Sequence, residues 1–213
     1  RSFHVTGVQT CALPISLKRL SNLGSGPGGV LVQPIPKAAR PTRIVKNALT
    51  VSVKGVTAQI THTPPSHTDN DLYVYFPEAN IIHAGTLFNA SGYPGIDNGG
   101  GNGTIDGIIT AADSMLSHAN DQTKVVPGHG PLQMKADLQA YRNMLVEARD
   151  RVAKLKAQQK SAQEVVDAKP LEGFDKRWAT DAMANERFVR VVYDTLTSVY
   201  VARVREAQMS GGK

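Results

Sequence analysis

The sequence of 213 residues has little cysteine, few aromatic residues and no acidic residue among its first 68 positions. Its single cysteine, Cys11, excludes a disulfide framework within the chain and any zinc module built from several cysteines. No run of about 18 uncharged apolar residues is present, so we expect no membrane span. The hydrophobic share of 41% is too high for a disordered chain, and the length suffices for a domain with its own core.

The excess of positive charge in the chain comes from its first 68 residues. The first acidic residue is Asp69, and residues 1–68 contain eight lysines and arginines. The remaining residues contain 16 basic and 18 acidic side chains, so the net charge of +6 comes wholly from residues 1–68. A basic chain would ordinarily favour a nucleic-acid partner. Because the chain from Asp69 onward is slightly acidic, we expect a small-molecule substrate and no nucleic-acid partner.

Residues 1–47 are expected to lie outside the functional domain. The stretch VTGVQTCALPIS, Val5–Ser16, resembles the conceptual translation of a sequencing-library adapter, and we interpret residues 1–16 as derived from it. The alternative is a genuine N-terminal segment or a degenerate signal peptide. We interpret residues 17–47 as a linker or a segment of doubtful reading frame, because residues 17–41 are rich in glycine and proline without a sustained period. Under this interpretation we expect the natural N-terminus to lie upstream of this sequence. Both the cytoplasm and the periplasm are then consistent with the sequence as locations of the protein.

From residue 48 onward the pattern predicts strands followed by helices. Alternating apolar and polar residues over 48–53 and 56–62, separated by Gly55, predict a β-hairpin. Further strands are predicted over 72–76, 81–84 and 124–127, with a long loop over 85–103. Thr104 is expected to cap a helix ending near residue 119, and Ser161 and Glu164 form a capping box for a short helix. Apolar stripes predict two more helices, over about 135–158 and 185–205.

Two histidines lie where metal ligands are commonly found, on loops beyond the ends of predicted strands. His67 precedes one strand, and His129 lies between two glycines after another. Flanking glycines allow close backbone approach and help to fix the direction of the ring, and neutral imidazole is a good zinc ligand. The alternative is that both are ordinary surface histidines. His62 and His83 fall within strands, where we expect a packed or hydrogen-bonded structural role.

The segments HTPPSHTDNDLYVYFPEANIIHAGTLF, His62–Phe88, and VVPGHGP, Val125–Pro131, resemble the metallo-β-lactamase-fold hydrolases. The similarity extends over about residues 45–205. It implies an α/β fold, the metallo-β-lactamase αββα sandwich, of which this chain holds the C-terminal part only. Residues 48–134 would form that part, and residues 135–213 would be C-terminal helices that pack on it or extend it.

The resemblance also implies a metal site and a reaction. The family holds one or two zinc ions at the edge of its two sheets. By position, His67 matches a ligand of the first zinc and His129 a ligand of the second. A metal-bound hydroxide would attack the carbonyl of a lactam, ester or thioester. In the same family the loop after residue 88 runs beside the active-site mouth, which makes Tyr93, Asp97 and Asn98 candidates for substrate contact.

Two features depart from the family's pattern. The motif H-x-H-x-D-H, which supplies most of the ligands, is absent from this sequence, and Thr86 stands where the metal-bridging aspartate is usual. A threonine hydroxyl is neutral and a poor zinc ligand. We therefore expect a fragment of a zinc-dependent hydrolase that binds zinc weakly or not at all and is itself inactive. The alternative is a non-catalytic binding or scaffold protein of the same fold. Neither the oligomeric state nor the other catalytic residues follow from the sequence.

Overall fold

The computed structural model describes residues 11–12, 18, 21–22, 24–25, 31–40 and 43–210. The chain divides into two compact units, residues 1–49 and 50–213. The described part of the first unit holds two strand pairs, β1 (Cys11–Ala12) with β4 (Arg43–Ile44) and β2 (Gly24–Ser25) with β3 (Leu31–Val32), and a 3-10 turn η2 (Lys37–Ala39). Apart from Cys11 and Ala12, the adapter-like segment lies outside the described residues.

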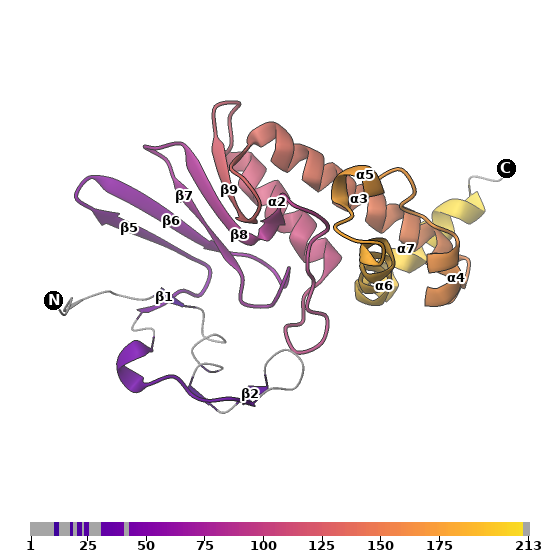
Figure 1. The fold of residues 1–213 in the computed structure, drawn as a ribbon, viewed down its shortest axis with the longest axis horizontal. Coiled ribbons are helices and arrows are strands. Elements are labelled where there is room, and N and C mark those ends of the chain that lie inside the picture. The colour runs from indigo at the N-terminus through magenta and orange to yellow at the C-terminus, as the bar shows by residue number, and fades with distance from the viewer. Residues whose placement is uncertain are drawn as a thin grey trace. The chain divides into compact units, whose positions relative to one another are not determined.

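Six strands form one sheet in the order β10-β9-β8-β7-β6-β5 (Figure 1). The pairs β6–β7, β7–β8 and β9–β10 are antiparallel, whereas β8 and β9 are parallel and are joined through a helix, as a parallel pair requires. The predicted hairpin is confirmed. The strands are β5 (Ala48–Val53), β6 (Val56–His62), β7 (Leu72–Phe76), β8 (Ile81–Asn89), β9 (Lys124–His129) and β10 (Gln133–Met134).

Helices pack on one face of this sheet. Helix α2 (Ile105–His118) contacts β8, and helix α3 (Lys135–Ala157) packs on α2. The side chains between sheet and helix include a hydrogen bond of 2.7 Å between Tyr73 Oη and Ser114 Oγ. Helices α4 (Ala162–Asp167), α6 (Ala184–Thr195) and α7 (Ser198–Ser210) contact α3 in turn (Figure 1). Among the described residues, no helix is both long and apolar enough to cross a bilayer.

The opposite face of the sheet carries the side chains that alternate with the buried ones. His83 pairs in register with Val74 on one side and with Val126 on the other. Ile82, which precedes His83 in β8, and Val125, which precedes Val126 in β9, are fully buried. By contrast, Val74 and Val126 are half-buried and His83 is exposed. Of the two roles expected for His83, packed or hydrogen-bonded, the packed one is wrong, because its position in the pleat directs the side chain away from the helices.

Several further expectations need correction. Strand β8 continues to Asn89 rather than ending at residue 84. Strand β9 continues to His129 rather than ending at residue 127, because Asn89 still pairs with His129, so His129 ends a strand and does not lie on a loop. The predicted helix over 185–205 is two helices, because Leu196 has an extended conformation (φ −64°, ψ 125°) and the Thr197 hydroxyl accepts a hydrogen bond from the Tyr200 amide at 3.2 Å. Strand β10 and a short helix α5 (Asp175–Trp178) were not predicted. The caps at Thr104 and Ser161 are confirmed by their hydrogen bonds.

Candidate functional site

Four strand ends meet at one edge of the sheet. Strand β6 ends at His62, which pairs with Leu72 at the start of β7. Strand β8 runs antiparallel to β7, so its end at Asn89 lies toward the same edge, where Asn89 pairs with His129 of β9. The loop of residues 63–71, which carries His67, therefore leaves the sheet at the edge where β9 presents His129. The structure brings both predicted ligands to this edge.

The ring of His67 is oriented by a backbone carbonyl. Its Nδ1 lies 2.8 Å from the carbonyl oxygen of Gly95. A carbonyl oxygen only accepts, so Nδ1 carries the proton and Nε2 keeps its lone pair. Metal-binding histidines commonly have this arrangement, in which the second ring nitrogen donates to a carbonyl or carboxylate. No role was predicted for Gly95, because a contact through its backbone carbonyl does not depend on the residue type.

The loop of residues 90–104, called here the bridging loop, contacts both histidines. At its start the amide of Ala90 donates to the carbonyl oxygen of His129 at 2.9 Å. Further along, the amide of Asp97 donates to the carbonyl oxygen of His67, also at 2.9 Å. Together with the hydrogen bond that the His67 imidazole donates to the carbonyl oxygen of Gly95, these contacts connect the two predicted ligands through one segment of backbone.

Glycines permit the close approach of backbones around His67. A Cβ built on Gly103 would lie 2.3 Å from the carbonyl oxygen of His67, and one on Gly107 would lie 1.7 Å from that of Pro65. On the β9 side, a Cβ on Gly128 would lie 2.6 Å from the carbonyl oxygen of Gly85. Each distance is far below van der Waals contact, so these positions accept only glycine without movement of the backbone.

The two aspartates after His67 hold its loop. Asp71 accepts hydrogen bonds from the amide of Thr68 at 2.7 Å and from its hydroxyl at 2.9 Å. Asp69 accepts one from the side-chain amide of Asn102 in the bridging loop at 2.8 Å. Both carboxylates thus serve the loop conformation.

The residues at this edge do not complete a metal site. A tetrahedral zinc site takes three or four protein ligands. Within residues 43–210 and the shorter described stretches before them, no three His, Cys, Asp or Glu side chains come together to hold a metal ion. Thr86 is exposed on β8, and its neutral hydroxyl does not replace a carboxylate. His67 and His129 suit the role of single ligands, but the described residues do not fit a whole zinc centre.

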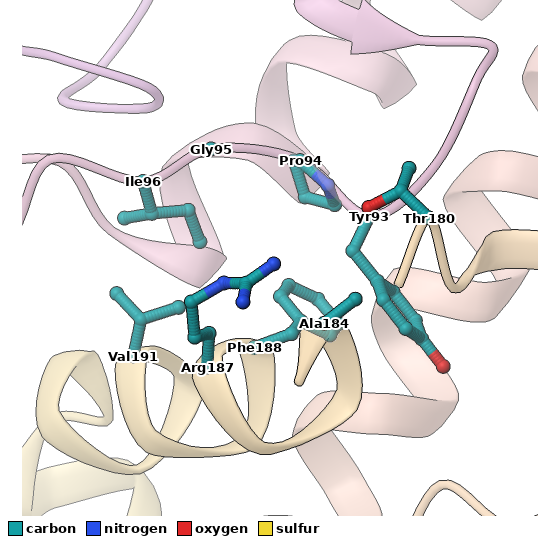
Figure 2. Close-up of a pocket in the computed structure, with 9 residues that line it drawn as sticks. All are labelled: Tyr93, Pro94, Gly95, Ile96, Thr180, Ala184, Arg187, Phe188 and Val191. Carbon is teal, nitrogen blue, oxygen red and sulfur yellow. The ribbon is translucent and has the colours of Figure 1, made fainter. Parts of the chain in front are cut away.

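The three candidates for substrate contact have different environments. Asp97 and Asn98 are exposed at the turn of the bridging loop, where the Asp97 carboxylate accepts a hydrogen bond from the amide of Gly99 at 3.1 Å. Tyr93 is buried, with its ring stacked on that of Phe188 in α6 at a centroid distance of 4.6 Å. These two rings belong to a hollow between the bridging loop and α6 (Figure 2).

Comparisons with known proteins show the fold. Neither a protein-family profile nor a curated protein matches the sequence. Among solved structures, the chain is similar to the stereoselective inverting sec-alkylsulfatase Pisa1 from Pseudomonas sp., with a TM-score of 0.60 and 17% identity over 85% of this chain and 30% of that one. It is also similar to the BLEG-1 B3 metallo-β-lactamase, with a TM-score of 0.53 and 18% identity over 65% of each chain. The chain thus spans under two thirds of the length of either protein, and its mixed α/β fold is that of the metallo-β-lactamases.

Proposed function

We propose that this chain, which has the metallo-β-lactamase fold, is the C-terminal part of a zinc-dependent hydrolase that acts on a lactam, ester or thioester. In this proposal His67 and His129 each contribute one ligand to a metal centre, one for each of two zinc ions in the complete protein. The remaining ligands come from outside this sequence. Alone, the chain binds zinc weakly and hydrolyses none of these substrates efficiently.

The observation that carries the proposal is the placement of the two histidines at one edge of the sheet, connected by the bridging loop. The carbonyl of Gly95 orients His67 so that Nε2 is available to a cation. Two exposed surface histidines with no common function would not need one loop to contact both of them.

The second face of the sheet supports the view that this chain supplies one half of a sandwich. Val74 and Val126 are only half-buried there, beside the exposed His83. An αββα sandwich would bury such a face against a second sheet, and burial stabilises by about 25 cal/mol per Å² of apolar surface. The partial coverage of the solved structures agrees with this view.

The second candidate is a non-catalytic binding or scaffold protein of the same fold, which Thr86 favours. Without a carboxylate at this position, a second cation would lose its charged bridging ligand. The two candidates differ in what the complete protein does, because a scaffold would turn over no substrate even with a full set of histidines.

The test starts from the genomic sequence upstream of residue 17, which defines the complete protein. We expect a motif H-x-H-x-D-H about 100 residues before His67, bound zinc, and turnover of a chromogenic lactam or a generic ester or thioester. The spacing estimate assumes one sheet and helix layer of ordinary domain size. H67A and H129A in the complete protein should each lower zinc content. Zinc without turnover would favour the scaffold, and a protein without the motif or zinc would contradict both.

We further propose that the partner is a small molecule and that nucleic acid is not bound. The chain from Asp69 onward carries no excess of positive charge. Binding to DNA or RNA that weakens steeply with salt would contradict this, because contacts to phosphates release counterions.

A further inference from the structure

We propose that the hollow between the bridging loop and helix α6 binds a small carboxylate with an apolar body. We further propose that it is the specificity pocket of the neighbouring sheet edge, and this second part rests on the proposed function. The hollow has a volume of about 310 Å³, which lies within the roughly 300–1,000 Å³ typical of ligand sites. It is formed within the second unit of the chain by Tyr93, Pro94, Gly95, Ile96, Thr180, Ala184, Arg187, Phe188 and Val191.

The lining of this hollow, called here the Arg187 pocket, combines apolar side chains with a comparable area of polar atoms. Ile96 and Val191 face each other across it, and the ring of Phe188 forms its floor (Figure 2). The apolar part of the lining suits the aliphatic or aromatic body of a ligand, and the polar part suits a single polar end group.

The charged side chain that lines the pocket is Arg187, which forms an ion pair with Asp181. The side chain of Arg187 extends from α6 toward the segment of Pro94 and Gly95 (Figure 2). Its Nη2 donates to Oδ2 of Asp181 at 2.6 Å, which engages one of the five N–H donors of the guanidinium and restrains its position. The planar fork of an arginine matches a carboxylate, so a ligand with an apolar body and a carboxylate end satisfies both the walls and the cation.

The pocket shares a wall with the segment that orients His67. Gly95 lines the pocket, and its carbonyl oxygen accepts the hydrogen bond from His67 Nδ1. The same segment is fixed at Tyr93, whose amide donates to the carbonyl oxygen of Trp178 at 2.9 Å. A ligand that contacts Pro94 and Gly95 therefore touches the backbone on which the direction of the imidazole depends.

The test measures binding of 4-phenylbutyrate to the metal-free chain, with the uncharged 4-phenylbutanamide as the matched ligand. Calorimetry gives the affinity, and the fluorescence of Trp178, the one tryptophan of the chain, reports on the residue whose carbonyl oxygen holds Tyr93 next to the pocket. We expect saturable binding of the carboxylate and weaker binding of the amide. Absence of saturation up to about 10 mM would overturn the proposal.

Two charge variants on the same helix make the test specific. R187A should weaken carboxylate binding by about fivefold to tenfold, as expected for a partly exposed charged pair, and should leave amide binding unchanged. R190A is the matched control, because Arg190 pairs with Glu186 and Gln163 and does not line the pocket. Equal effects of the two variants would overturn the assignment to Arg187. A184F, which fills the pocket, should abolish binding of both ligands, and circular dichroism verifies that it folds.

The link to His67 has its own readout. In NMR spectra of the metal-free chain, saturation with 4-phenylbutyrate should shift the ring signals of His67 and leave those of His118 unchanged. Binding without a shift at His67 would overturn the assignment as a specificity pocket. Neither measurement involves zinc or turnover, so a failure of the proposed hydrolase function would leave these results intact. Equally, absence of 4-phenylbutyrate binding would leave the test of the hydrolase function unaffected.

Discussion

The Nδ1 atom of His67 lies 2.8 Å from the carbonyl oxygen of Gly95, which is 28 residues further along the chain. This contact predicts that neutral His67 carries its proton on Nδ1 and keeps Nε2 as an acceptor. Long-range ¹H–¹⁵N correlation spectra distinguish the two tautomers, and H67Q identifies the signal. The Nδ1–H form is expected at pH 8. A predominant Nε2–H form, the tautomer common for exposed histidines, would contradict the proposed orientation.

The approach of α2 to the His67 loop depends on Gly107. In an ordinary helix Gly→Ala stabilises by about 1 kcal/mol, but here the added Cβ would lie 1.7 Å from the carbonyl oxygen of Pro65. We expect the clash to dominate and G107A to lower the free energy of unfolding by about 3 kcal/mol or more. G100A is the control, because a Cβ at Gly100 meets nothing within 4 Å. Denaturant unfolding compares the two, and equal stabilities would contradict the packing described.

Much of the fold follows from local sequence pattern. Alternation located the hairpin of β5 and β6, and caps located the starts of α2 and α4, because these signals lie within a few residues of the element they define. The longer extent of β8 was missed because its second half is held by pairing with β9, about 40 residues later. The break at Leu196 was missed for a different reason: the cap at Thr197 is a local signal, but it lies within an otherwise helical pattern that continues past it.

The candidate site was predicted only in part. An expected loop position and the flanking residues pointed to His67 and His129; His67 lies on a loop and His129 ends β9, and the structure brings both to one edge of the sheet. The role of Gly95 was not predictable, since a hydrogen bond from a side chain to a backbone carbonyl leaves no pattern in the residue types. The place of Arg187 beside the bridging loop requires the packing of α6, which is set by contacts with α3.

The capping box of α4 gives a prediction about stability at acid pH. The Ser161 hydroxyl and backbone amide donate to Glu164, and the hydroxyl bond is the main cause that lowers the pKa of this carboxyl. Because the folded-state pKa of Glu164 is lowered, its ionised carboxylate stabilises the folded chain at pH values above the ordinary pKa of glutamate. This stabilisation is lost as the pH falls through the lowered pKa. S161A should cost about 1 kcal/mol near pH 7 and less at pH 3. S117A, at an exposed serine outside any N-cap, is the control, and equal losses in both variants would contradict the cap.

Tyr200 gives a prediction at alkaline pH. Burial, reinforced by its hydrogen bond to the Asp150 carboxylate, raises the pKa of this phenol from 10.0 to about 12. Because the folded state then keeps its proton where the unfolded state loses it, this stabilisation is complete below pH 10 and is lost between about pH 10 and 12. The absorbance difference at alkaline pH between the chain and Y200F isolates this group. A midpoint near 10 in that difference would contradict the environment described.

The central claim is that His67 and His129 are single ligands of an incomplete zinc centre, and zinc affinity tests it most directly. The purified chain of residues 17–213 is titrated with zinc against a chelator of known affinity, alongside H67A and H129A. We expect dissociation constants weaker than about 1 µM, because a complete structural zinc site contributes about 10–16 kcal/mol and two separate ligands fall well short of it. We also expect each variant to weaken the binding further. One tightly bound zinc per chain, or weak binding unaffected by both variants, would contradict the account.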